Sequence, residues 1–114
     1  VFGKPADAAD ARAMLAELAG REHQVLSSVA LRGADIDNVL TSTTTVRFAS
    51  LTPAQIARYV HSGESLGRAG AYAIQGLAGC FAERIDGSYS GVMGLPLCET
   101  AELLRRIGLD PLLR

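Results

Sequence analysis

Arg68 and Gln75 are the side chains of this sequence best placed to bind a ligand. They stand among small neighbours in a stretch, residues 62–97, that has eight glycines. Glycine allows a positive φ and a close approach of the backbone, and both conditions are common around bound phosphates and nucleotides. Glycine-rich turns also serve simply to connect short elements, so the residue types leave a ligand site and a structural role both open.

Two long runs within this stretch resemble a known family. Residues 67–76 read Gly-Arg-Ala-Gly-Ala-Tyr-Ala-Ile-Gln-Gly, and residues 86–97 read Asp-Gly-Ser-Tyr-Ser-Gly-Val-Met-Gly-Leu-Pro-Leu. They resemble, in the right order, the C-terminal signature of the Maf family, nucleoside triphosphate pyrophosphatases first known as septum-formation proteins. The resemblance begins at Gly-Lys-Pro, residues 3–5, and covers essentially the whole chain.

The resemblance implies an α/β fold similar to that of inosine triphosphate pyrophosphatases. Such a fold has a long, twisted mixed sheet flanked by helices, and here its N-terminal part is absent. The implied reaction is hydrolysis of a nucleoside triphosphate between its α and β phosphates. It uses a divalent metal cation, Mg or Mn, and releases a monophosphate and pyrophosphate.

By the same resemblance, Lys4 and Arg68 would face the triphosphate and Gln75 would face the base. Arg68 keeps the charge of the lysine found in many relatives and adds a fork for two phosphate oxygens. The carboxamide of Gln75 matches a uracil or thymine edge, so we expect dTTP and UTP as substrates. Glu64, followed by Ser65 where the family usually has proline, is expected to cap a helix or to support the residues that bind substrate. From the sequence alone, Lys4 could equally be a frayed terminal side chain in water.

Several family motifs have no counterpart in this sequence. They are a Ser-x-Ser-Pro-Arg-Arg motif, a metal-associated glutamate, and an Ala-Asp-Thr whose aspartate is the presumed general base; all precede Gly-Lys-Pro in the family. We therefore assign no catalytic residue and no metal ligand within the chain, and place the presumed base upstream of Val1. We expect residues 1–114 to form a single domain, the C-terminal portion of a longer enzyme. A sheet cut short in this way has an unpaired edge, so we also expect a homodimer.

Two alternatives stay open, the first of which belongs to another functional class. One is a catalytically inactive, truncated fragment or a binding module connected with cell division. Another is a purine-directed enzyme of the same fold, which Gln75 disfavours.

Composition excludes several partners. Lysine and arginine number 11 against 12 acidic residues, so no net field attracts polymeric nucleic acid or an anionic membrane surface. No apolar run reaches the ~18 residues that span a bilayer. Cys80 and Cys98 follow no signal peptide, so we expect them to stay reduced in a cytoplasmic protein.

Local signals predict the elements that must position the candidate residues. A capping box, Thr52 to Gln55, predicts a helix that ends at residues 61–63. His61 is expected to lie in its last turn as a cap rather than a catalyst, and His23 to bind no ligand. The other predicted elements are a helix over 6–19, antiparallel strands over 24–31 and 39–48 joined by a loop at 32–38, a short helix over 66–77, a strand pair over 80–85 and 88–93, and a helix over 96–107. We expect the strand over 24–31 to be covered on both faces, and Val46 and Phe48 to share one face of the next strand. Tyr59 is expected in the apolar stripe of the helix that follows Thr52, and Leu97 is expected to face inward from the last helix.

Overall fold

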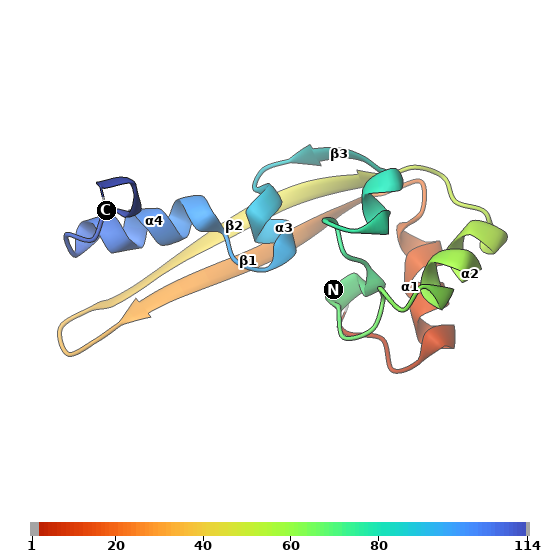
Figure 1. Ribbon diagram of the computed structural model, residues 1–114, viewed down its shortest axis with the longest axis horizontal. Helices are drawn as coiled ribbons and strands as arrows, with labels where there is room; N and C mark the ends of the chain where they lie inside the picture. Colours follow the sequence, from red (N-terminus) through yellow and green to blue (C-terminus); the bar gives the residue numbers. More distant parts are fainter. Residues whose placement is uncertain (1–2, 114) are drawn as a thin grey trace. The chain divides into compact units, whose positions relative to one another are not determined.

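The computed structural model of this chain describes residues 3–113, whose contacts form two compact units. Unit 1 comprises Val1–His23 and Val46–Ile85, and unit 2 comprises Gln24–Thr45 and Asp86–Arg114. In chain order the elements are α1 (Ala8–Leu18), β1 (Glu22–Arg32), β2 (Asp37–Phe48), α2 (Pro53–His61), the 3-10 helices η1 (Ala69–Ala71) and η2 (Leu77–Cys80), β3 (Ala82–Asp86), α3 (Tyr89–Met93), α4 (Leu97–Arg106) and the 3-10 helix η3 (Pro111–Leu113) (Figure 1). The expected α/β class is confirmed.

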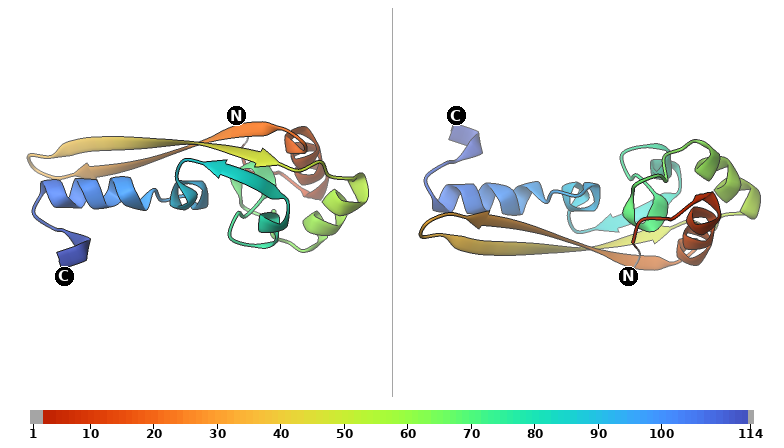
Figure 2. Two further views of the ribbon diagram at one scale, coloured as in Figure 1. Left: turned by 90° about the horizontal axis from the view of Figure 1, so that it is seen from above. Right: turned by 90° about the horizontal axis from the view of Figure 1, so that it is seen from below.

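The described sheet has three strands in the order β1-β2-β3, with β1 and β2 paired as an antiparallel hairpin. Two cross-strand contacts give its register: Ser28 Oγ lies 2.9 Å from Thr41 Oγ1, and Arg32 Nε lies 3.2 Å from Asp37 Oδ1. The predicted hairpin is therefore confirmed, with a tighter loop than expected. Within unit 2, α4 runs alongside residues 24–45 of the hairpin (Figure 2).

Burial alternates along both strands of the hairpin. In β2 the even-numbered residues from Ser42 to Phe48 are buried, as predicted for the face of Val46 and Phe48. The prediction that the first strand is covered on both faces is wrong, because every second residue of β1 is exposed and Leu26 is 64% exposed. Within the described residues, β1 has one face turned to solvent.

Unit 1 has the two helices that the sequence signals predicted. Asp7 caps α1 by accepting a hydrogen bond from the Asp10 amide at 2.8 Å. Thr52 and Gln55 form the expected capping box of α2, and His61 lies in its last turn. The fully buried Phe48 ring packs edge-on against several neighbouring rings, at centroid distances of 4.8 to 5.0 Å from His23, Tyr72 and Phe81.

The helix predicted over residues 66–77 is wrong. This segment is a series of turns with one 3-10 turn, and Gly70 and Ala71 both have a positive φ, 74° and 69°. Tyr72 then returns to an extended conformation and is buried. An α-helix cannot contain such residues, because consecutive left-handed φ values reverse its winding.

Two further predictions near the C-terminal end need correction. The strand expected over residues 88–93 is the short helix α3, which Ser88 caps by accepting a hydrogen bond from the Gly91 amide at 3.0 Å. The helix expected over 96–107 is present as α4, but its buried residue is Leu103, whereas Leu97, expected inward, is 59% exposed. Cys80 and Cys98 are both exposed free thiols. Among the described residues, the helices are all too short or too polar to cross a bilayer.

Candidate functional site

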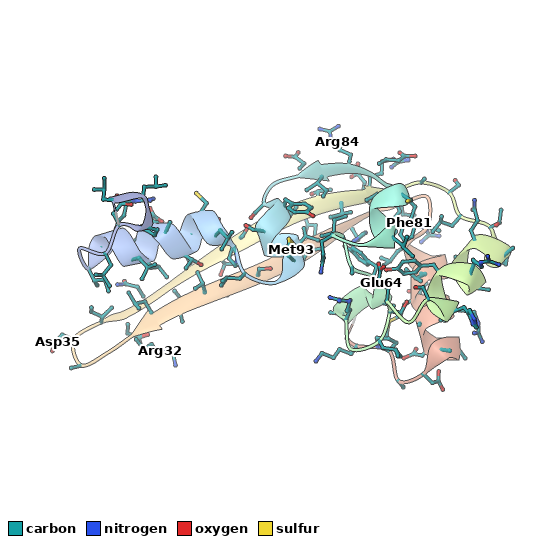
Figure 3. All side chains as sticks on the ribbon, in the orientation of Figure 1. Arg32, Asp35, Glu64, Phe81, Arg84 and Met93 are labelled. Atoms are coloured by element: carbon teal, nitrogen blue, oxygen red, sulfur yellow. The ribbon has the colours of Figure 1, made fainter. Side chains whose placement is uncertain are left out.

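The Glu64 carboxylate connects α2 to the loop that carries the candidate binding residues (Figure 3). Its Oε1 accepts a hydrogen bond from the Tyr59 hydroxyl at 2.7 Å, and its Oε2 accepts one from the Leu77 amide at 2.9 Å. The Tyr59 hydroxyl in turn accepts a hydrogen bond from the Ala73 amide at 3.1 Å. We call these four groups the Glu64 clasp. It ties both ends of the segment 73–77 to one carboxylate.

Gly76 is the residue of this segment that packs directly against the clasp. A Cβ at this position would lie 2.5 Å from the Glu64 Cδ and Oε1 atoms. Any larger residue would therefore push the carboxylate away from its two donors. Glycine at position 76 therefore leaves room for the carboxylate in the place where it accepts both hydrogen bonds.

The clasp has a consistent electrostatic character. Burial of the Glu64 carboxyl opposes its ionisation, but hydrogen bonds from the Leu77 amide and the Tyr59 hydroxyl outweigh this and keep its pKa below the ordinary value. Burial, together with the Glu64 carboxylate, raises the pKa of Tyr59 far above its usual value. At neutral pH, Glu64 is thus an acceptor for two donors and Tyr59 remains a hydroxyl.

The two expected phosphate-binding cations come from segments that the backbone holds together. The Gly70 amide donates to the Gly3 carbonyl at 3.2 Å, which brings the backbone next to Lys4 beside the turn that follows Arg68. Arg68 Nε donates to the Glu64 carbonyl oxygen at 3.0 Å. Both cationic side chains are exposed. Because Nε is used in this bond, the terminal nitrogens of the guanidinium are the ones that can bind a further acceptor.

Gln75 lies between the two tied ends of the segment 73–77 and is exposed. Within residues 3–113, no hydrogen bond holds its carboxamide and no described contact joins it to Lys4 or Arg68. The structure therefore places Arg68, Glu64 and Gln75 on one loop, with Lys4 beside it through the backbone. That these side chains share one ligand stays a prediction.

Sequence reasoning missed the role of Tyr59, which it treated only as part of the apolar stripe of α2. The side chain is buried, yet its hydroxyl uses both a donor and an acceptor function. Glu64 was expected to be a cap or a support, and its two contacts now define that support. Ser65, which follows it, is buried with no hydrogen-bond partner for its Oγ among the described residues.

A hollow of about 340 Å³ lies elsewhere in unit 1, lined by Arg12, Ala13, Ala16, Leu51, Pro53 and Ile56. None of the predicted binding residues is among them. We therefore base no functional assignment on this hollow.

A divalent cation does not fit the donors found in the described part of the chain. Residues 3–113 contain no group of three or more His, Cys, Asp or Glu side chains that could hold a metal ion. Glu64, the carboxylate nearest to Arg68 in sequence, already accepts hydrogen bonds on both oxygens.

Comparisons with known proteins match this chain over nearly its full length. The model of a family described as Maf-like protein matches residues 1–107. A Chromobacterium violaceum protein named dTTP/UTP pyrophosphatase is 56% identical over 110 residues, which are 96% of this chain and 56% of that protein. Proteins of the same name from Bordetella avium and Hahella chejuensis are 59% and 53% identical over 109 residues, 96% of this chain and 54% of each relative. The chain thus spans about half the length of the curated relatives that it matches.

Proposed function

This chain belongs to the Maf-like protein family, and on that premise we propose that it is part of a nucleoside triphosphate pyrophosphatase. The proposed reaction converts dTTP or UTP, or a modified pyrimidine triphosphate, to the monophosphate and pyrophosphate. The relatives named dTTP/UTP pyrophosphatase, 53 to 59% identical to this chain, support the choice of substrate. Because the chain covers about half of each relative, the proposal concerns a protein that also contains the remaining half.

The observation that carries the proposal is the loop geometry around the Glu64 clasp. One loop presents a guanidinium at Arg68 and a carboxamide at Gln75, and the Gly3–Gly70 hydrogen bond places Lys4 beside it. The two cations would neutralise charge on the phosphate oxygens. The carboxamide would donate to a carbonyl and accept from the N3–H of a uracil or thymine ring.

A divalent cation is proposed for the complete enzyme. When bound, such a cation would neutralise phosphate charge and orient the attacking water. Its ligands would lie outside residues 3–113, which contain no suitable cluster. The part of the chemistry that this chain supplies is the binding of the phosphates and the base.

The test is pyrophosphate release by the chain extended at its N-terminus with the residues that precede the match in the Chromobacterium relative. We expect turnover of dTTP and UTP with Mg or Mn, and much less of dATP. Gln75→Glu should lower the ratio of dTTP to dATP turnover by roughly tenfold or more, since a carboxylate can accept from the N3–H of the base but cannot donate to its carbonyl. Gln24→Glu, at an exposed position outside the loop, is the matched control.

Two results would contradict this proposal in different ways. If the extended protein releases no pyrophosphate from any triphosphate, the proposed reaction is wrong. If it is active but Gln75→Glu leaves the substrate ratio unchanged, the reaction stands and the role of Gln75 is wrong. Activity of the extended protein with none in the 114-residue chain would support the alternative that the chain alone is an inactive fragment.

We also propose that the complete protein forms a homodimer. In the described sheet β1 has a neighbouring strand on one side only, so its outer edge carries backbone groups that another strand could pair. The molar mass of the extended protein in solution tests this. A monomeric mass at micromolar concentration would contradict it.

A further inference from the structure

We propose that Glu64, acting partly through Tyr59, is a positioning residue that holds Gln75 in the orientation needed to read a base. Neither residue needs to touch the substrate for this role. Its base-reading part rests on the function proposed above, whereas the restraint of the segment 73–77 does not.

Both ends of the segment 73–77 are held by hydrogen bonds to side chains. The Ala73 amide is held by the Tyr59 hydroxyl and the Leu77 amide by Glu64 Oε2, at 3.1 and 2.9 Å. Gln75 is the central residue between them. Fixing the backbone on both sides of a residue restricts where its side chain can point, even when that side chain is itself exposed.

Tyr59 and Glu64, which hold this segment, are themselves attached to the packed helix α2. Tyr59 lies in the last turns of α2, and its ring packs edge-on against Phe81 at a centroid distance of 5.1 Å. Glu64 follows closely after the end of this helix, and the Glu64 amide donates a hydrogen bond to Ser62 Oγ at 3.3 Å. The clasp is therefore anchored to a packed helix, and the loop is attached to that anchor.

A carboxylate at position 64 is well suited to hold both donors. An ionised carboxyl accepts from two donors at once, and such charge-assisted bonds are stronger than those between neutral groups. A carboxamide at position 64 keeps the shape but replaces one oxygen by an NH2 group, so one of the two positions that now accept a hydrogen bond would present a donor instead. Gly76 leaves the room that the carboxylate occupies.

The consequence for binding is preorganisation. A glycine-rich exposed loop must be ordered when a ligand binds, and that ordering lowers affinity. A loop already tied at residues 73 and 77 loses less freedom. Loosening the clasp should therefore weaken recognition of the base more than binding of the phosphates.

The first experiment measures hydrogen exchange of single amides by NMR in the extended protein. Tyr59→Phe should speed exchange at Ala73, and Glu64→Ala should speed exchange at Leu77, each by about tenfold or more, because each amide then loses the acceptor that holds it. Thr52→Ala is the matched control: it removes the cap of the same helix and leaves the clasp intact. Unchanged exchange in both clasp variants would overturn the proposal.

The second experiment asks whether Tyr59 acts through Gln75. We expect Tyr59→Phe to lower the ratio of kcat/KM for dTTP over dATP by roughly fivefold or more, and Thr52→Ala to leave that ratio unchanged. In a Gln75→Ala background, Tyr59→Phe should have no further effect on the ratio, since coupled residues are not additive. An equal effect in both backgrounds would show a merely structural role and overturn the positioning of Gln75.

The two failures are distinguishable. Absence of pyrophosphate release from the unsubstituted extended protein refutes the proposed function. The exchange rates at Ala73 and Leu77 still decide whether Glu64 restrains the loop.

Discussion

One ring nitrogen of His23 has a hydrogen-bond partner, and the other has none among the described residues. Its Nε2 lies 2.7 Å from the Tyr72 hydroxyl, and its ring packs edge-on against Phe48 and Tyr72. Its Nδ1 is buried without a partner among the described residues. Burial accordingly lowers the pKa of His23 below its ordinary value of 6.5 and raises that of Tyr72 to about 12. The sequence predicted that His23 binds no ligand, and this stays a prediction.

The lowered pKa of His23 predicts a pH-dependent stability. A histidine that protonates more readily in the unfolded chain favours unfolding as pH falls, so its contribution is fully present above about pH 6.5 and is lost as pH falls through the folded pKa. We expect the melting temperature to fall between pH 7 and pH 5. His23→Gln should flatten that fall, whereas His61→Gln, at an exposed position, should not. Equal pH dependence in the His23 variant and the unsubstituted protein would contradict this account.

The elements fall into two groups according to what stabilises them. Helices α1 and α2 begin at caps formed by neighbouring residues, Asp7 with Asp10 and Thr52 with Gln55. The turn before α3 depends instead on a contact with β2, which is distant in sequence. The Thr44 hydroxyl accepts a hydrogen bond from the Ser88 amide at 2.9 Å. The first group could be predicted from local sequence, and the second could not.

Gly87 offers a test of that distant contact. A Cβ at this position would lie 2.6 Å from Thr44 Oγ1 and 2.9 Å from Thr44 Cα, at a φ of +137°. Gly87→Ala should therefore lower the free energy of unfolding by roughly 2 to 4 kcal/mol. Gly33→Ala, where no atom lies within 4 Å, should change it by less than about 0.5 kcal/mol. Urea denaturation measures both, and similar midpoints for the two variants would show that the contact with Thr44 is not as described.

At the scale of the molecule, the outer face of the hairpin carries exposed apolar side chains. Leu26 is 64% and Val39 is 52% exposed, on residues that alternate with the half-buried ones of β1 and β2. A row of exposed, uncharged residues beside an unpaired strand edge favours association with another chain.

We expect the 114-residue chain to self-associate through this face. Leu26→Lys places a charge on it and should reduce association in sedimentation velocity without lowering the melting temperature, since the position is exposed. Ala57→Lys adds the same charge at an exposed position of α2 and should leave association unchanged. Equal sedimentation of the two variants would place the contact elsewhere.

Residue types and their spacing were sufficient for the capping box of α2, the hairpin and the family resemblance, whereas the binding roles of Lys4, Arg68 and Gln75 stay predictions. They were sufficient because caps and turns depend on neighbours a few residues apart, and because the signature runs are continuous in the chain. They were insufficient for the segment 66–77, where the expected helix is absent, and for the outward face of β1.

The hydrogen bonds of the Glu64 clasp could not be predicted from the sequence, because they join residues that are far apart in it. Its hydrogen bonds join residues 13 and 14 positions apart, Leu77 to Glu64 and Ala73 to Tyr59, across a loop with no periodic pattern. Which donor meets which acceptor depends on how that loop packs against α2 and Phe81. Tyr59 and Glu64 therefore acquire their proposed role, which is to hold the backbone on both sides of Gln75, only in the folded chain.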